Sequence, residues 1–172
     1  MNTVPEEIVE QTWEELSDLS FEESEELIHD LTEEQPYVLA YLMGIGTDIL
    51  NEGEREVLLY LGMTVWKMMD NASLHNLPRV TDIDLDAADK RNLQVLETLE
   101  GESPGDFYAT VKRFMTDYNQ PEILKFVVET LMEEEGDLFE FDEDDEEIEE
   151  VREEMKGMMM IFLKTLIDSL DK

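Results

Sequence analysis

The chain has 172 residues, of which 46 are Asp or Glu and 12 are Lys or Arg, so its formal net charge is −34. It has no cysteine, which excludes a disulfide scaffold, a thiolate metal site and a thiol nucleophile. The charge also excludes free-standing binding of nucleic acid, because that needs a cationic surface to displace counterions from the phosphates.

Helical periodicity dominates the first half of the chain. Apolar residues recur at helical spacing over residues 8–19 and predict a first helix. Ser20 with Glu23 three residues later has the pattern of a capping box, which predicts the start of a second helix. A third helix is predicted over residues 36–50 and a fourth over residues 54–70. The fourth is apolar on nearly all sides, so we expect it to be central and buried.

The second half returns to the helical pattern after a polar stretch. Residues 72–83 contain Pro78 and polar breakers, and are predicted to be a linker. Asp82 or Asp84 is the expected N-cap of the helix that follows. No stretch keeps the alternation of a β-strand, so the expected fold is all-α with about eight helices. The second-half helices are predicted over residues 85–99, 106–118, 121–134 and 151–170.

The two halves resemble each other in sequence. Residues 35–43 align with residues 120–128 at an offset of 85, and the next helix aligns at an offset of 97, so the second copy has a 12-residue insert. The insert falls at about residues 137–148. We expect a single domain over residues 1–172, made of two similar four-helix units packed as one helical array or bundle. The units are residues 5–71 and 84–172; an irregular eight-helix bundle is the alternative.

The negative charge is concentrated in two blocks. Residues 1–54 hold 16 acids and no Lys or Arg, and residues 133–154 hold 15 acids and one Arg. Like charges four residues apart, such as Glu10 and Glu14, destabilise a helix by about 0.2–0.5 kcal/mol a pair at low salt. A basic protein partner would relieve this repulsion; a solvated face or an adaptation to high salt is the alternative. The candidate partner-binding residues are Glu14, Glu15, Glu22, Glu23, Glu26, Asp142, Asp144, Asp145, Glu146 and Glu147.

Motifs for metal binding and catalysis are incomplete. Glu26 and His29 have the helical spacing of a di-iron ligand pair, but the one other histidine, His75, lies in the linker. Residues 82–86 and 142–146 begin like calcium loops, and neither has the glycine required at the sixth position. No catalytic triad or phosphate-binding glycine loop is present. No cofactor and no metal are therefore expected.

The sequence predicts a non-catalytic interaction module for a basic protein, with nucleic-acid mimicry as a special case. The alternative is a carboxylate-based binder of divalent cations, or an enzyme of unknown reaction. An enzyme is expected to bury two or three carboxylates in a cleft with raised pKa values, whereas a docking module spreads them over an exposed face. The sequence has no signal-peptide pattern, and its longest apolar run, residues 158–163, is too short to span a membrane. We therefore expect a cytoplasmic protein without a membrane partner. The sequence carries no signal for an oligomeric state.

Overall fold

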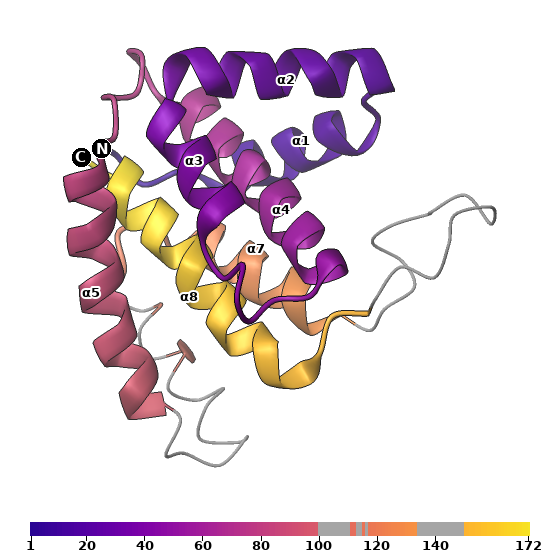
Figure 1. Ribbon diagram of the computed structural model, residues 1–172. Coiled ribbons are helices and arrows are strands. Elements are labelled where there is room, and N and C mark those ends of the chain that lie inside the picture. The colour runs from indigo at the N-terminus through magenta and orange to yellow at the C-terminus, as the bar shows by residue number, and fades with distance from the viewer. Residues whose placement is uncertain (100–110, 113–114, 116, 134–149) are drawn as a thin grey trace.

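The computed structural model describes residues 1–99, 111–112, 115, 117–133 and 150–172 (Figure 1). These residues form seven helices and no strand, so the described part of the chain is all-α, as predicted. The predicted helix over residues 106–118 falls largely outside the described residues, and the predicted insert at residues 137–148 falls wholly outside them. The helices are α1 (Glu6–Ser17), α2 (Phe21–Glu34), α3 (Pro36–Gly44), α4 (Glu52–Ala72), α5 (Asp82–Leu99), α7 (Pro121–Met132) and α8 (Glu153–Leu170).

Two long helices, α4 and α8, form the centre of the molecule and pack against each other. Helices α1, α2 and α3 pack against α4, while α5 and α7 pack against α8 (Figure 1). Trp66 of α4 and Ile161 of α8 are fully buried, and each helix is covered on most sides. The prediction that the fourth helix is central is therefore confirmed. Gly62 allows α3 to approach closely, because a Cβ atom there would lie 2.4 Å from a methyl group of Leu42.

Three helices begin with reciprocal side-chain caps. Ser20 and Glu23 form the predicted capping box of α2. A second capping box, which the sequence reading did not anticipate, starts α4 with Asn51 and Glu54. Before α5, the backbone N–H and hydroxyl of Thr81 donate to Asp84 Oδ2, and the Asp84 N–H donates to the Thr81 hydroxyl. Thr81 is therefore the capping residue, in place of either aspartate, and α5 begins three residues earlier than predicted.

The third helix is shorter than predicted, because α3 ends at Gly44 rather than near Leu50. A turn over residues 45–49 follows, in which Gly46 has a φ of 73°. This left-handed conformation favours glycine, and a Cβ atom at Gly46 would also lie 2.8 Å from the Leu50 side chain. The apolar spacing over residues 45–50 therefore reflects a turn that returns Leu50 to the core.

A buried glutamine holds the segment before α5 against the start of α3. Gln35, which directly precedes α3, is 1% exposed. Its Oε1 accepts from the backbone N–H of Val80 at 2.9 Å, and its Nε2 donates to the carbonyl of Pro78 at 3.1 Å. The amide thus pairs with two backbone groups of an extended segment, as a neighbouring strand would.

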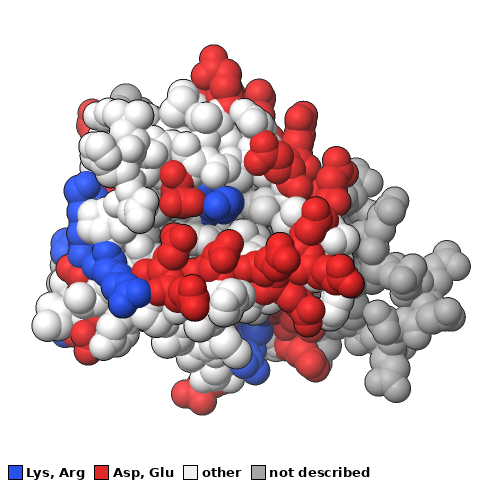
Figure 2. Space-filling model, turned by 90° about the horizontal axis from the view of Figure 1, so that it is seen from above, with Lys and Arg blue, Asp and Glu red and all other residues white. Residues whose placement is uncertain are grey.

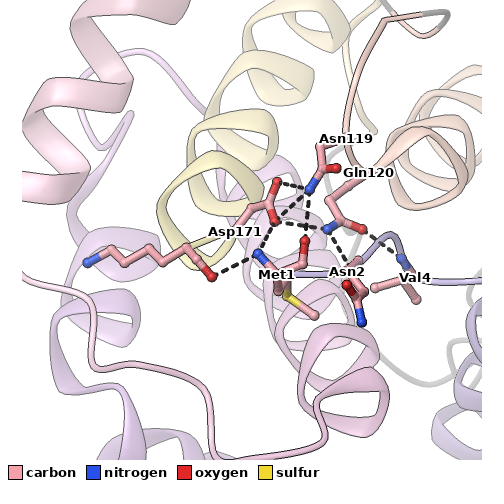
Figure 3. Close-up of polar contacts among 7 residues, drawn as sticks. Met1, Asn2, Val4, Asn119, Gln120 and Asp171 are labelled. Atoms are coloured by element: carbon pink, nitrogen blue, oxygen red, sulfur yellow. Dashed lines mark hydrogen bonds and ion pairs between the residues drawn. The ribbon is translucent and has the colours of Figure 1, made fainter.

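A second buried glutamine does the same for the segment before α1 (Figure 3). The Oε1 of Gln120, which directly precedes α7, accepts from the N–H of Val4 at 2.9 Å, and its Nε2 donates to the carbonyl of Asn2 at 3.1 Å. Next to it the terminal amine of Met1 forms an ion pair with Asp171 at 3.1 Å. The first and last residues of the chain therefore lie together at one end of α8 (Figures 1 and 3).

Candidate functional site

The acids of α1 and α2 are all exposed, and we call the surface that they make up on these two helices the acidic face. All five carboxylates of α1 and all seven of α2 are exposed, and neither helix has a Lys or Arg. Figure 2, which looks down on α2, shows carboxylates spread across this side of the molecule. The predicted residues Glu14, Glu15, Glu22, Glu23 and Glu26 all lie on this face, whereas Asp142, Asp144, Asp145, Glu146 and Glu147 lie outside the described residues.

Two of these five glutamates also have local structural contacts. The Glu23 carboxylate accepts from the Ser20 N–H, and bonds to the Ser20 backbone and hydroxyl hold the pKa of Glu23 below its usual value. Glu15 accepts a hydrogen bond from Gln11 one turn earlier. The presence of a glutamate at position 23 is therefore partly explained by its role in the capping box of α2. Glu14, Glu22 and Glu26 are the better probes of a docking role.

Helix α2 combines its acids with exposed apolar side chains. Within α2, which is described in full, Leu31 is the one residue that is fully buried. Phe21 is 77% exposed and Ile28 is 38% exposed. Helix α2 therefore contributes one fully buried side chain to the core and exposes an aromatic ring among its carboxylates.

A pocket of about 360 Å³ lies between α3 and α5, which we call the α3–α5 pocket. Tyr37, Ala40 and Tyr41 of α3 line one side of it. From α5 it is lined by carboxylates at helical spacing, so that one face of that helix points at two aromatic rings. The α5 residues are Asp82, Leu85, Asp86 and Asp89, and Ile45 completes the lining.

Asp89 is the most unusual group of the pocket. Its Oδ1 atom is buried and has no hydrogen-bond partner of normal geometry among the described residues. Burial raises the pKa of Asp89, and the charge of Asp86 raises it further, whereas the nearby Tyr41 hydroxyl and Lys90 oppose these effects. Burial of the Tyr41 hydroxyl raises the pKa of Tyr41, and the charge of Asp89 raises it further. The pocket therefore holds a negative charge that its own walls neutralise incompletely.

The carboxylate of Glu54, which is 0% exposed, is fully paired. Arg152 donates to it from the backbone N–H, from Nε at 2.9 Å and from Nη2 at 2.8 Å, and the Asn51 N–H donates to Oε2 at 2.9 Å. Burial alone would raise the pKa of Glu54, but these hydrogen bonds outweigh it and lower the pKa. This ion pair joins the start of α4 to the residue before α8 and has a structural role.

A polar network between α5 and α8 is likewise complete. Lys164 donates to Asn92 at 3.0 Å and to Asp168 at 2.7 Å, while Asn92 donates to Thr165 and to Asp168. The Tyr118 hydroxyl donates to the other oxygen of Asp168, and burial together with that charge raises the pKa of Tyr118. Because its members satisfy one another, the network orients α5 on α8 and needs no ligand.

The described residues contain no group of three or more His, Asp or Glu side chains arranged to hold a metal ion. His29 forms an exposed contact with Glu33 at 3.6 Å on the acidic face, and no second histidine joins it. Among the same residues, no helix is long and apolar enough to cross a membrane.

The chain matches no known protein-family model, and neither curated proteins nor solved structures show significant similarity to it. The described part of the chain is all-α, and the sequence as a whole is strongly acidic.

The α3–α5 pocket was not predicted from the sequence. Asp82, Asp86 and Asp89 stand four and three residues apart, which places them on one helix face, and this spacing is a signal that the sequence does carry. The sequence does not indicate which helix packs against this face of α5. The aspartates form a pocket because Gln35 fixes the start of α5 beside α3.

Proposed function

We propose that the protein is a non-catalytic interaction module that binds a basic protein through the acidic face of α1 and α2. The observation that carries this proposal is the composition of α2. It exposes seven carboxylates together with Phe21 and Ile28, and contributes one fully buried side chain to the core. Long-range attraction would speed the approach of a cationic partner, and the apolar groups would add contact area.

The exposed apolar groups favour docking over a merely solvated surface. A helix adapted only to remain soluble gains nothing from exposing Phe21, because apolar area in water is unfavourable. In a complex the same ring would be buried. The like-charge pair Glu22 and Glu26 would lose its repulsion at the same time.

We also propose that the chain consists of two similar four-helix units. Helices α1–α4 form the first unit, and α5, the predicted helix over residues 106–118, α7 and α8 form the second. The matching bonds of Gln35 and Gln120 support it, since each glutamine precedes a proline-started helix and holds the segment before the other unit's first helix. The central positions of α4 and α8 support it as well.

The proposed function is tested by titrating isotope-labelled protein with a short peptide of alternating lysine and glycine and mapping the NMR shift changes. The expected result is that amides of α1 and α2 move most, with binding that weakens as salt increases. Changes spread evenly over the exposed carboxylates of the molecule, or no binding at low salt, would contradict the proposal.

The alternative, a carboxylate-based cation binder or an enzyme, stays a prediction. Among the described residues, the pocket carboxylate whose burial raises its pKa is Asp89.

A further inference from the structure

The two glutamine clamps define which residues of the two predicted units correspond. Val4 and Val80 donate to Gln120 and Gln35 over the same distance of 2.9 Å. An offset of 76 residues therefore carries α1 onto α5, with Glu6 and Asp82 as their first residues. The sequence offset of 85 carries α3 onto α7. The surface where α3 meets α5 thus has a counterpart where α7 meets α1.

The counterpart surface is filled by the protein's own side chains. Lys125 stands where α3 has Ala40, and its ammonium lies 3.2 Å from Glu6 and 3.9 Å from Glu122. Trp13 stands where α5 has Asp89, and its ring packs on Phe126 with the ring centroids 5.1 Å apart. A lysine and a tryptophan therefore occupy the space between these two helices.

In the α3–α5 pocket both filling groups are missing. Ala40 has no side chain that could reach the acids of α5, and Asp89 takes the place of the large indole ring. The substitutions leave a space of about 360 Å³, within the range of about 300–1,000 Å³ typical of small-ligand pockets. They also remove a cation and add a carboxylate.

We propose that the α3–α5 pocket binds the ammonium group of a lysine side chain from the basic partner, one helical turn further along α5 than Asp82, the counterpart of the Glu6 that pairs with Lys125. This inference rests on the proposed function and adds the chemistry of one anchor. The alkyl stem of the lysine would lie between Tyr37 and Tyr41, which offer apolar and π surfaces. Its three N–H donors would meet Asp86 and the unpartnered Oδ1 of Asp89.

The direct test is to fill the pocket from within. Ala40 is exposed, so Ala40→Lys is expected to fold, with its ammonium near Asp82 as Lys125 lies near Glu6. The control is Ala87→Lys, which adds the same charge at an exposed position of α5 outside the pocket lining. Affinity for the lysine–glycine peptide should fall about five- to tenfold in Ala40→Lys relative to Ala87→Lys, as expected for the loss of one desolvated cation–π and charge contact.

A second pair of variants keeps the test valid if Ala40→Lys does not fold. Asp89→Asn removes one of the three pocket carboxylates with little change in volume, and Asp48→Asn removes an exposed charge outside the pocket. The affinity of Asp89→Asn for the peptide should be lower than that of Asp48→Asn. Equal affinities within both pairs would overturn the lysine pocket and leave the acidic-face proposal standing. Failure of the unmodified protein to bind the peptide at low salt would overturn the acidic-face proposal itself.

Discussion

At the scale of single residues, the Glu54–Arg152 ion pair stabilises the junction of α4 and α8. Glu54 is 0% exposed, so removing its partner leaves a buried charge without its main donors. Breaking a fully buried pair costs about 3–5 kcal/mol. Because the Arg152 side chain is 42% exposed and water would replace part of its contribution, we expect Arg152→Ala to lower the free energy of unfolding by about 2–3 kcal/mol.

Chemical denaturation of Arg152→Ala measures this cost, with Arg55→Ala as the control. Arg55 is exposed on α4 next to Glu54, and its loss should change stability by less than about 0.5 kcal/mol. The pKa of Glu54 is lowered in the folded protein, so the pair contributes stability above the unfolded pKa of about 4.3 and loses it as the pH falls through the folded pKa. Arg152→Ala should therefore reduce the loss of unfolding free energy at acid pH. An unchanged pH dependence would contradict a stabilising role for the pair.

Asp89 has the opposite pH dependence. Because its pKa is raised on folding, its ionised form destabilises the native state, and this cost develops as the pH rises from the unfolded pKa of about 3.9 through the folded pKa. Asp86, Lys90 and the Tyr41 hydroxyl all act on this carboxylate. Asp89→Asn should therefore melt at a higher temperature than the unmodified protein at pH 7, and the difference should shrink toward pH 3. A lower Tm at pH 7 than that of Asp48→Asn would contradict this.

At the scale of elements, the two glutamine clamps should contribute similarly, with Gln120 slightly the larger because its Nε2 also donates to Asp171 Oδ1 at 3.0 Å. Gln35→Ala and Gln120→Ala each remove two hydrogen bonds to backbone groups and leave a buried N–H without its acceptor. We expect each to lower the free energy of unfolding by about 2–3 kcal/mol. Gln11→Ala, which removes an exposed hydrogen bond to Glu15, should cost less than about 1 kcal/mol. A cost near zero for one clamp would argue against equivalent units.

The boundaries of the helices show how far local sequence determines structure. The capping box of Ser20 and Glu23 could be predicted because both partners lie within four residues. Asn51 and Glu54 form the same motif and could have been found by the same rule. The end of α3 could not, because the space at Gly46 is limited by tertiary packing: a Cβ atom there would lie 3.1 Å from the ring of Phe162, which is more than a hundred residues away in sequence.

The two candidate surfaces also differ in whether local sequence determines them. The exposed acids of α1 and α2 follow from helical periodicity and composition, so their positions could be predicted from the sequence. The α3–α5 pocket could not, since it depends on which helices meet. Its aspartates also belong to a helix whose expected boundaries omitted Asp82.

At the scale of the whole molecule, a net charge of −34 opposes the compact state. Monovalent salt should screen this repulsion, since the Debye length falls to about 10 Å at 0.1 M. Relief of only two like-charge helix pairs is worth about 0.4–1 kcal/mol, and 1 kcal/mol corresponds to about 2–4 °C in a protein of this size. Calorimetry should therefore show Tm rising by at least about 1 °C between low and moderate sodium chloride; a flat or falling Tm would show that self-repulsion is unimportant.

The central claim is that the acidic face, rather than total charge, binds a basic partner. The measurement that tests it most directly compares two triple variants in calorimetric titrations with the lysine–glycine peptide at fixed salt. One is Glu14→Gln, Glu22→Gln and Glu26→Gln on the acidic face; the other is Glu56→Gln, Asp117→Asn and Glu129→Gln, which removes the same charge from exposed positions elsewhere. We expect the first variant to bind about tenfold more weakly, a loss of about 1.4 kcal/mol, and the second less than about twofold more weakly. Equal weakening by the two variants would contradict it.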